Sequence, residues 1–354
     1  MRRRPTRMVR VGSVVIGGDA SVSVQSMTNT DTRDVEGTLD QIRYLAIVKA
    51  DIVRVAVPRA NALEAFGDIV RRAPVPIVAD VHFDHRLAVE AAKRGAHKIR
   101  INPGNIGGRA EVAEVVSAAR DHGIPIRVGV NAGSPEEDLL ARYGGPTPEA
   151  LVESAKRNHE LLRELGCEDV VVSIKASDVP TLIAANEAFA AETDVPLHLG
   201  VTEAGLEADG AVKSAVGIGA LLARGIGDTI RVSLTADPAQ EVHVGRGILR
   251  TLGLITGPEL ISCPTCARCR IDLQPLAQRV ADALTHVEAP IKVAVMGCEV
   301  NGPGEAKHAH VGIAGGMGKA VLFRLGEVVQ TVPEQDAGDV LLREIETLAR
   351  QWST

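Results

Sequence analysis

Aromatic residues are scarce in this sequence, with one Trp, two Tyr and four Phe in 354 residues. Surfaces that bind single-stranded nucleic acid stack bases on aromatic rings, so we do not expect such a surface here. An excess of positive charge is also missing, because 39 Lys and Arg stand against 45 Asp and Glu, for a net charge of −6. The sequence therefore provides no bulk attraction to nucleic acid or anionic lipid, and any anion site must be local.

Long apolar runs are absent, since no stretch reaches the roughly 18 apolar residues of a membrane span. The start, MRRRPTRMVR, lacks the apolar segment of a secretory signal, so we expect a cytoplasmic protein. Cysteines are few and odd in number, and four of the five lie in the last third of the chain. That distribution does not fit a disulfide framework and indicates metal or redox chemistry. Cys167 stands apart, and we expect it to be an inert buried thiol.

A Val- and Ile-rich run, then a loop, then an Ala-, Glu- and Arg-rich stretch closed by Gly, recurs eight times between residues 22 and 234. Consecutive apolar positions are typical of parallel strands buried on both faces. Eight such units predict an α/β fold, a TIM (β/α)8 barrel, with a doubly wound open sheet as the alternative. The expected strands are Val22 to Met27, Asp51 to Val57, Pro76 to Val81, Lys98 to Asn102, Pro125 to Val130, Val170 to Lys175, Pro196 to Thr202 and Thr229 to Leu234.

Two segments flank these units. Val9 to Gly18 indicates a hairpin placed to plug the bottom of the barrel. The composition changes at Thr256-Gly-Pro, where we place a boundary between a barrel domain, residues 1–256, and a small α/β domain, residues 257–354. Within the tail we expect strands at Ile291 to Met296 and around Val311 to Ile313, and a helix from about Ala337 to Gln351.

The tail carries the strongest chemical signal, the loop Cys263-Pro-Thr-Cys266 followed by Cys298. Such a loop lets two thiolates face one metal, and a third cysteine after a strand can reach the same point. The spacing leaves open an iron–sulfur cluster, a zinc site with Cys269 as fourth ligand, and a redox-active dithiol. Glu305 follows an Asn-Gly-Pro-Gly turn that can return its carboxylate to the cysteines as a labile oxygen ligand, although a solvated loop residue is the simpler interpretation.

Positive charges lie within or at the ends of apolar strands, where they are costly unless they face a ligand or partner. In a barrel such positions converge at the carboxyl ends of the strands. The set is Arg54, Arg100, Arg127, Lys175 and Arg231, with Asn102, Asn105, Asn131 and Ser233 beside it as further donors. Five cations at one mouth predict a polyanionic ligand such as a diphosphate, although any single residue could instead form a buried ion pair.

Acidic and imidazole groups share this rim. Asp80 and Glu203 follow the third and seventh strands, and we expect them to transfer protons. His82 suits either a catalytic or a structural role, whereas His198 lies in an apolar run and is expected to be structural.

Nine motifs occur along the chain in order. They are SVQSMTNT, VADVHFD, RINPGNIG, RVGVNAGS, VSIKASD, PLHLGVTEAG, GIGDTIRVSL, CPTC and GCEVNGPGE. Together they closely resemble the bacterial 4-hydroxy-3-methylbut-2-enyl diphosphate synthases of the non-mevalonate isoprenoid pathway, over nearly the whole chain.

The resemblance implies a TIM barrel followed by a ferredoxin-reductase-like domain, in a homodimer where the cluster of one subunit closes the barrel of the other. It implies a 4Fe-4S cluster held by Cys263, Cys266, Cys298 and Glu305. The implied substrate is 2-C-methyl-D-erythritol 2,4-cyclodiphosphate, bound at the five cations identified above. Reduced flavodoxin or ferredoxin would supply two electrons for reductive dehydroxylation and ring opening, and Glu203 would protonate the departing oxygen.

Cys269 departs from the family pattern, and we expect it to point away from the cluster. The alternative hypothesis is a zinc-stabilised barrel that acts on a phosphorylated or pterin-like substrate without redox chemistry.

Overall fold

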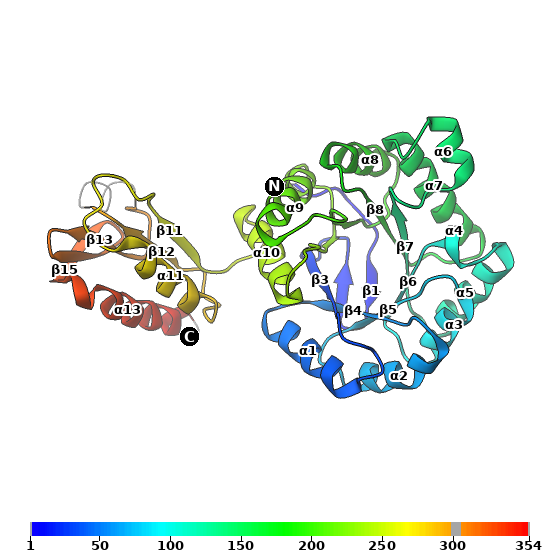
Figure 1. The fold of residues 1–354 in the computed structure, drawn as a ribbon, viewed down its shortest axis with the longest axis horizontal. Helices are drawn as coiled ribbons and strands as arrows, with labels where there is room; N and C mark the ends of the chain where they lie inside the picture. Colours follow the sequence, from blue (N-terminus) through cyan, green and yellow to red (C-terminus); the bar gives the residue numbers. More distant parts are fainter. Residues whose placement is uncertain (1, 299–305, 353–354) are drawn as a thin grey trace. The chain divides into compact units, whose positions relative to one another are not determined.

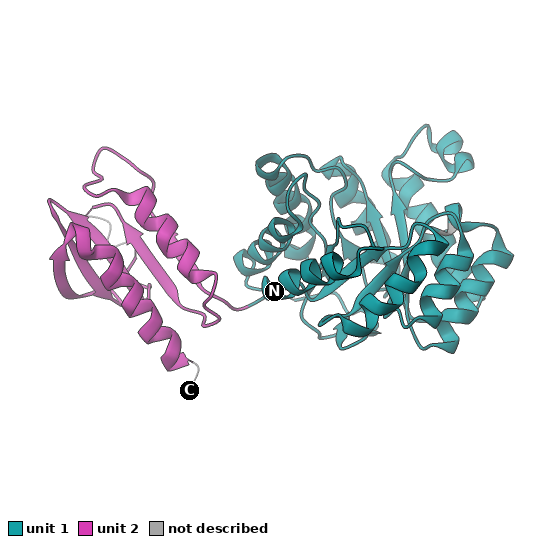
Figure 2. Cartoon of the chain, turned by 60° about the horizontal axis from the view of Figure 1, so that its bottom comes forward, with its two compact units in different colours: residues 1–255 teal, residues 256–354 magenta. Residues whose placement is uncertain are grey.

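The computed structural model describes residues 2–298 and 306–352. The chain divides into two compact units, residues 1–255 and 256–354 (Figure 2). Each unit has a hydrophobic core of its own, so the two are described separately.

The first unit is a ring of eight parallel strands surrounded by helices (Figure 1). The strands are β3 (Ser23–Met27), β4 (Ile52–Ala56), β5 (Ile77–Asp80), β6 (Lys98–Ile101), β7 (Ile126–Asn131), β8 (Val170–Lys175), β9 (His198–Leu199) and β10 (Thr229–Ile230). β10 pairs with both β3 and β9, and a bridge between Val172 and Leu197 joins β8 to β9. The predicted TIM barrel is therefore confirmed, and the open sheet is wrong.

β9 and β10 are shorter than the sequence predicts, because the ladder ends at Leu199 and Ile230. A Cβ on the next residue, Gly200, would lie 2.5 Å from the carbonyl oxygen of Arg231 and 2.7 Å from Nζ of Lys175. The missing side chain thus admits a close approach at the carboxyl end of the barrel, where regular strand spacing is lost.

The helices cover the outside of the ring, and several begin at residues suited to capping. They are α1 (Val35–Ile47), α2 (Leu63–Arg72), α3 (His85–Lys93), α4 (Pro103–Ile106), α5 (Arg109–Asp121), α6 (Glu137–Tyr143), α7 (Pro148–Glu164), α8 (Val179–Glu192), α9 (Glu207–Ala223) and α10 (Pro238–Thr251), with the 3-10 turn Ala60–Ala62 before α2. At α7, for example, the Thr147 hydroxyl accepts a hydrogen bond from the backbone N–H of Ala150 at 3.3 Å, and Pro148 takes the first helical position.

An antiparallel hairpin, β1 (Val9–Val11) and β2 (Val14–Ile16), closes one end of the ring, and β1 lies inside it in Figure 1. Its apolar side chains form one cluster with residues near the amino ends of β4, β5 and β8. The buried members are Val9, Val11, Ile16, Ile52, Val78 and Val171. The expected plug is therefore confirmed, and the polar part of the barrel interior begins above it.

The second unit is a five-stranded sheet with two helices. In sheet order the strands are β11 (Glu259–Ser262), β12 (Lys292–Met296), β13 (Val311–Gly316), β14 (Lys319–Arg324) and β15 (Glu327–Pro333). The first three are parallel, and β14 and β15 return antiparallel. α11 (Leu273–Leu284) and α13 (Ala337–Trp352), which follows the 3-10 turn Glu334–Asp336, pack in one core with the sheet. The sequence predicted β12, β13 and α13 but not β11, β14 or β15.

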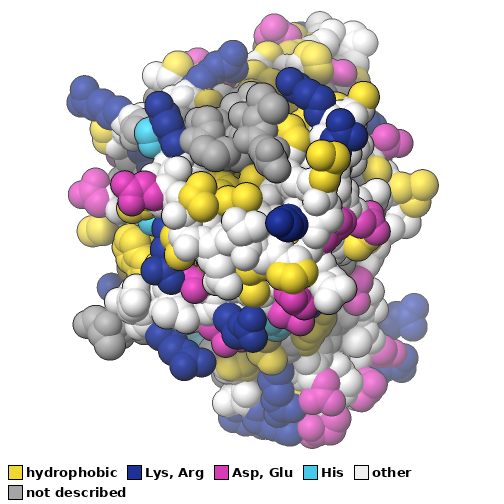
Figure 3. All heavy atoms as spheres, turned by 90° about the vertical axis from the view of Figure 1, so that its left-hand side faces the viewer, with side chains coloured by type: hydrophobic (Ala, Val, Ile, Leu, Met, Phe, Trp, Pro, Cys, Tyr) yellow, Lys and Arg dark blue, Asp and Glu magenta, His cyan; other side chains and the backbone are white. Residues whose placement is uncertain are grey.

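Within the described residues, no helix combines the length and apolar character needed to cross a bilayer. On the face drawn in Figure 3, basic side chains are interspersed with acidic and apolar ones. This mixing agrees with the mild net charge of −6.

Candidate substrate and cofactor sites

The five predicted cations lie together in the barrel interior, toward the carboxyl ends of the strands. Arg54, Arg100 and Arg127 lie on β4, β6 and β7, Lys175 ends β8, and Arg231 directly follows β10. Arg127 is 1% exposed and Lys175 is 7% exposed. Burial, followed by the charges of Arg127, Arg231, Arg54 and Arg100, holds the pKa of Lys175 well below its usual value. The cations are therefore close enough for each to act electrostatically on the others.

Asp80 stands among these cations at the end of β5. Its carboxylate lies 3.2 Å from Nη1 of Arg100 and 3.7 Å from Nη1 of Arg54. Nε2 of His82 is 3.6 Å from Asp80 and 2.6 Å from the same Arg100 nitrogen. Burial alone would raise the pKa of Asp80, but Arg54, His82 and Arg100 lower it well below its usual range. Asp80 therefore stays ionised, which suits it to hold guanidinium groups and not to donate a proton.

Two glycines make room for cation heads. A Cβ at Gly129 on β7 would lie 3.0 Å from both Nε and Nη2 of Arg100. A Cβ at Gly200 would meet Nζ of Lys175 at 2.7 Å. A larger residue at either position would displace a positively charged group from the barrel interior.

A second buried carboxylate, Glu241 on α10, holds Arg231. Both of its oxygens lie 3.2 Å from Nη2 of Arg231, and Oε1 also accepts from the backbone N–H of Leu234 at 3.0 Å. The sequence analysis missed Glu241 because it lies on a helix beyond the last expected barrel strand, where nothing marks one carboxylate as buried.

The four predicted neutral donors occupy different positions around the same end. Asn102 accepts from the N–H of Gly104 at 3.2 Å and donates to Oγ of Ser134 at 3.4 Å, so it shapes the start of α4. Asn105 lies within α4, and Asn131 ends β7 in register with Lys175. Ser233 is partly buried beyond β10.

Glu203 lies in the loop after β9, is exposed, and has a φ of 53°. The left-handed region is unfavourable for a residue other than glycine, and such strain is concentrated at functional sites. Phe83 shows the same feature after β5, with a φ of 68° and 76% of its surface exposed. Its ring centroid is 5.9 Å from that of His82. Both strained residues therefore lie in loops at the carboxyl ends of barrel strands.

Lys98 is an interior cation that the sequence analysis did not select. It lies two residues before Arg100 on β6 and is 0% exposed. Side chains two apart on a strand share a face, so the period of two was a sufficient signal. His198, expected to be structural, is also 0% exposed, and neither ring nitrogen has a hydrogen-bond partner in the described part of the chain.

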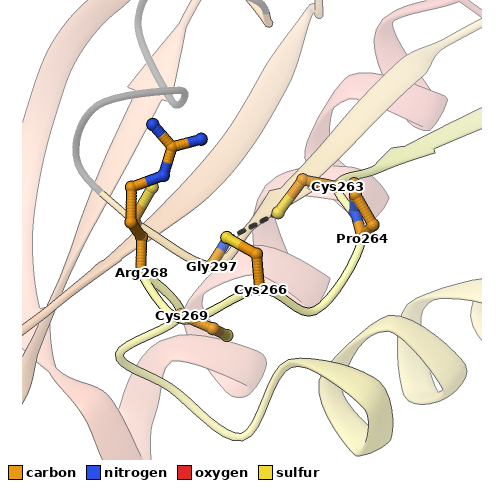
Figure 4. A pocket seen from close by; sticks show the side chains of 7 residues that line it. Cys263, Pro264, Cys266, Arg268, Cys269 and Gly297 are labelled. Carbon is orange, nitrogen blue, oxygen red and sulfur yellow. Dashed lines mark hydrogen bonds between the residues drawn. The ribbon is translucent and has the colours of Figure 1, made fainter.

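The cysteines of the second unit surround one small cavity of about 80 Å³ (Figure 4). Its lining is Cys263, Pro264, Cys266, Arg268, Cys269, Gly297 and Cys298. The backbone N–H of Gly297 donates to Sγ of Cys263 at 3.1 Å, and Figure 4 shows the side chains of Cys263 and Cys266 beside Gly297. Hydrogen bonds from the backbone and then the side chain of Arg268 lower the pKa of Cys266. The loop therefore favours the thiolate form of Cys266.

This donor set fits an iron–sulfur cluster. Soft thiolates prefer iron–sulfur clusters or zinc, and an N–H···S bond such as that from Gly297 is a known means of tuning a cluster. Within residues 2–298 and 306–352, no three His, Cys, Asp or Glu side chains are grouped tightly enough for a single metal ion. A cluster is wider than one ion and spaces its ligands further apart. The fourth predicted ligand, Glu305, lies outside the described residues.

Cys269 is tied to its own loop. Its thiol donates to the carbonyl oxygen of Ile271 at 3.2 Å. Its Sγ would be 2.6 Å from a Cβ at Gly297, so the two residues pack closely and only glycine fits there. Cys269 thus lines the cavity while its sulfur is engaged with the backbone.

Comparison with known proteins shows a family for the whole chain. A family model described as the GcpE TIM-barrel domain matches residues 6–246, and one described as the GcpE protein C-terminal domain matches residues 259–347. A protein of Natranaerobius thermophilus is 54% identical over 98% of this chain and 97% of its own length. One of Geobacter sulfurreducens is 55% identical over 97% of this chain and 98% of its own length. Both are named 4-hydroxy-3-methylbut-2-en-1-yl diphosphate synthase (flavodoxin).

Among solved structures, type I 3-dehydroquinate dehydratase of Clostridium difficile is similar with a TM-score of 0.51. It is 14% identical, and the match covers 71% of this chain and 99% of that one. At this identity the likeness concerns the barrel fold alone.

Proposed function

The chain belongs to the GcpE family, and from that premise we propose that it reduces and opens 2-C-methyl-D-erythritol 2,4-cyclodiphosphate to give 4-hydroxy-3-methylbut-2-enyl diphosphate. It is thus an oxidoreductase of isoprenoid biosynthesis. The observation that best supports this function is the presence, in one chain, of a cation-lined barrel interior and a cysteine-lined cavity. The first suits a cyclic diphosphate and the second suits an electron carrier.

In the barrel unit, the cations bind the diphosphate. Arg54, Arg100, Arg127, Lys175 and Arg231 supply the charge, and Asn105, Asn131 and Ser233 add neutral hydrogen bonds. Asp80 and Glu241 fix the guanidinium groups before the ligand arrives, so less side-chain entropy is lost on binding. These roles follow from placement and charge, and the family resemblance supports them.

In the C-terminal unit, Cys263, Cys266 and Cys298, with Glu305, would hold a 4Fe-4S cluster. When bound, the cluster would supply the two electrons of the reduction one at a time. Thiolates are soft ligands that bind iron strongly, whereas a glutamate oxygen is a harder and more labile ligand. Glu305 would therefore be the exchangeable member of this ligand set.

Glu203 donates the proton with which the hydroxyl leaves as water. Its strained, exposed position in the loop after β9 suits a group that must reach a bound ligand. Asp80, ionised among arginines, acts by positioning Arg54 and Arg100.

The test of this assignment is turnover of the cyclic diphosphate by anaerobic Glu203→Gln protein. Loss of a general acid should lower kcat by about 100-fold or more with iron content unchanged. The matched control is Glu207→Gln, an exposed glutamate in the first turn of α9, which should leave kcat unchanged. Normal turnover by a fully loaded Glu203→Gln enzyme would remove the proposed role.

The electron donor is a flavodoxin, in keeping with the names of the relatives, or a ferredoxin of similar potential. The protein acts in the cytoplasm as a homodimer in which the cluster of one copy serves the barrel of the other. A zinc-stabilised barrel without redox chemistry is not favoured, because full-length relatives at 54 and 55% identity carry a flavodoxin-dependent name.

A further inference from the structure

A lysine with no partner lies at the base of the cation cluster. Nζ of Lys98 is fully buried and has no hydrogen-bond partner in the described part of the chain. Lys98 is in register with Val78, which belongs to the cluster around the hairpin plug, and it precedes Arg100 by two residues on the same face of β6. Lys98 thus lies between the apolar plug and the proposed ligand-binding cations.

The charges that act on Lys98 are those of cations. Burial first, and then the charges of Arg127 and Arg54, hold the pKa of Lys98 well below its usual value. The pKa of His198 is also lowered, mainly by burial. The charges of Arg127, Lys175, Lys98 and Arg54 lower it further.

The barrel carboxylates near these cations are already engaged. Asp80 pairs with Arg54 and Arg100, and Glu241 pairs with Arg231. In the described residues, no carboxylate lies within ion-pair distance of Lys98. Burial and repulsion from several arginines would destabilise an ammonium there, and no nearby carboxylate would offset this effect.

Lysine and arginine differ in whether they lose their proton in a buried, positively charged environment. Arginine keeps its proton under all conditions compatible with folding, so the arginines in the interior carry fixed charge. An amine can release its proton and become neutral. Lys98 is therefore a member of the cluster whose charge can adjust to the presence or absence of an anion.

We propose that Lys98 is a neutral amine in the free barrel and becomes an ammonium when the cyclic diphosphate occupies the cations above it, so that ligand binding takes up one proton at this residue. The inference rests on the proposed function, because it requires a doubly charged diphosphate in the barrel. Lys98 need not touch the ligand, and it acts as a charge-adjusting residue beneath Arg100 and Arg127.

The sign of the pH effect follows from linkage. An anion raises the pKa of a nearby amine, so uptake occurs at pH values between the pKa of the free and of the bound state. Within that interval, affinity falls about tenfold per pH unit as pH rises, for each proton taken up. Each phosphate of the cyclic ligand has one ester bond and the shared anhydride bond, which leaves one strongly acidic oxygen on each, so the ligand does not titrate near neutral pH.

The experiment is anaerobic calorimetry of the full-length, cluster-loaded protein with the cyclic diphosphate at pH 8. Titrations in two non-phosphate buffers with different ionisation enthalpies give the number of protons taken up. Wild type should take up about one proton more than Lys98→Met. A difference near zero would overturn the proposal.

Two further measurements separate the alternatives. His198→Asn should keep the uptake, and its loss in that variant would assign the proton to the histidine and overturn the role of Lys98. If Lys98→Met does not fold, the affinities of wild type and of Lys175→Met are compared from pH 6 to pH 9. A flat profile for wild type, or a slope that is lost in Lys175→Met, contradicts the proposal. Absence of binding by wild type would instead contradict the proposed function, and the inference with it. A purely structural role for Lys98 would change stability and leave the proton count as it is.

Discussion

Buried cations and their few carboxylate partners define the chemistry of the barrel at the scale of single residues. Arg54 and Arg100 share Asp80, and Arg231 is held by Glu241. Arg127 is 1% exposed, and its Nε has no partner in the described residues. A barrel interior with this excess of buried positive charge is costly without an anion, and the cost is recovered when the ligand binds.

Asp80→Asn should destabilise the protein. The substitution leaves Arg54 and Arg100 without their buried countercharge, and removing one partner of a buried pair costs about 3 kcal/mol. The folded-state pKa of Asp80 is depressed, so its contribution is fully present above the unfolded pKa of about 4 and is lost as pH falls further. Urea unfolding at pH 7 measures the difference, and equal stability of both proteins there would contradict it.

Gly129→Ala should weaken ligand binding more than it weakens the fold. The added Cβ would lie 3.0 Å from Nε and Nη2 of Arg100 and so displace the guanidinium. We expect the Kd of the cyclic diphosphate to rise about tenfold. Gly219→Ala is the control, because a Cβ at Gly219 on α9 meets nothing within 4 Å. Equal Kd values for the two variants would show that Arg100 does not need the space.

At the scale of elements, the β1–β2 hairpin determines where the barrel interior becomes polar. It fills the amino end of the ring with apolar side chains against Ile52, Val78 and Val171. One buried polar group above it without a hydrogen-bond partner in the described residues is Lys98, in register with Val78. The hairpin thus excludes water from below, which strengthens every charge interaction above it.

Ile16→Ala should destabilise the barrel by about 3 kcal/mol, because it removes a fully buried side chain and leaves a cavity in the plug. Ile47→Ala in α1 is the matched control, since Ile47 is 71% exposed and should change stability by less than about 0.5 kcal/mol. Thermal and chemical unfolding of the two variants would measure the difference, and equal losses would argue against a packed plug.

Two features of the sequence, the apolar strand pattern and the charged residues within it, predicted most of the barrel and of its candidate site. Continuous apolar runs identified all eight barrel strands, and charges within them led to Arg54, Arg100 and Arg127. Lys98 was missed although it obeys the same period, because it stood at the start of its run. Glu241 gave no local signal, since its burial depends on helix packing against a strand. β15 was missed because six of its seven residues are exposed, so no buried run marks it.

At the scale of the whole molecule, the two units divide the reaction between them. Among the described residues, the proposed anion-binding cations lie in the barrel unit and the clustered cysteines lie in the C-terminal unit. The proposed reaction therefore requires both units. In the proposed homodimer, these come from different copies.

A mixing experiment tests that arrangement. Glu203→Gln lacks the barrel acid, and Cys298→Ser lacks a cluster ligand, so each alone should be inactive. Coexpression should restore about a quarter of wild-type activity, because half of the dimers are mixed and each has one complete site. If the cluster instead served its own barrel, no mixed dimer would have a complete site, and activity would stay at the level of the single variants.

The central claim is that Cys263, Cys266 and Cys298 hold a redox cluster in a chain that also carries a diphosphate-binding barrel. The most direct test is to purify the protein without oxygen and measure iron, acid-labile sulfide and zinc per chain. The account predicts about four iron and four sulfide, falling sharply in Cys298→Ser. One zinc with negligible sulfide, persisting after reconstitution with iron and sulfide, would contradict it.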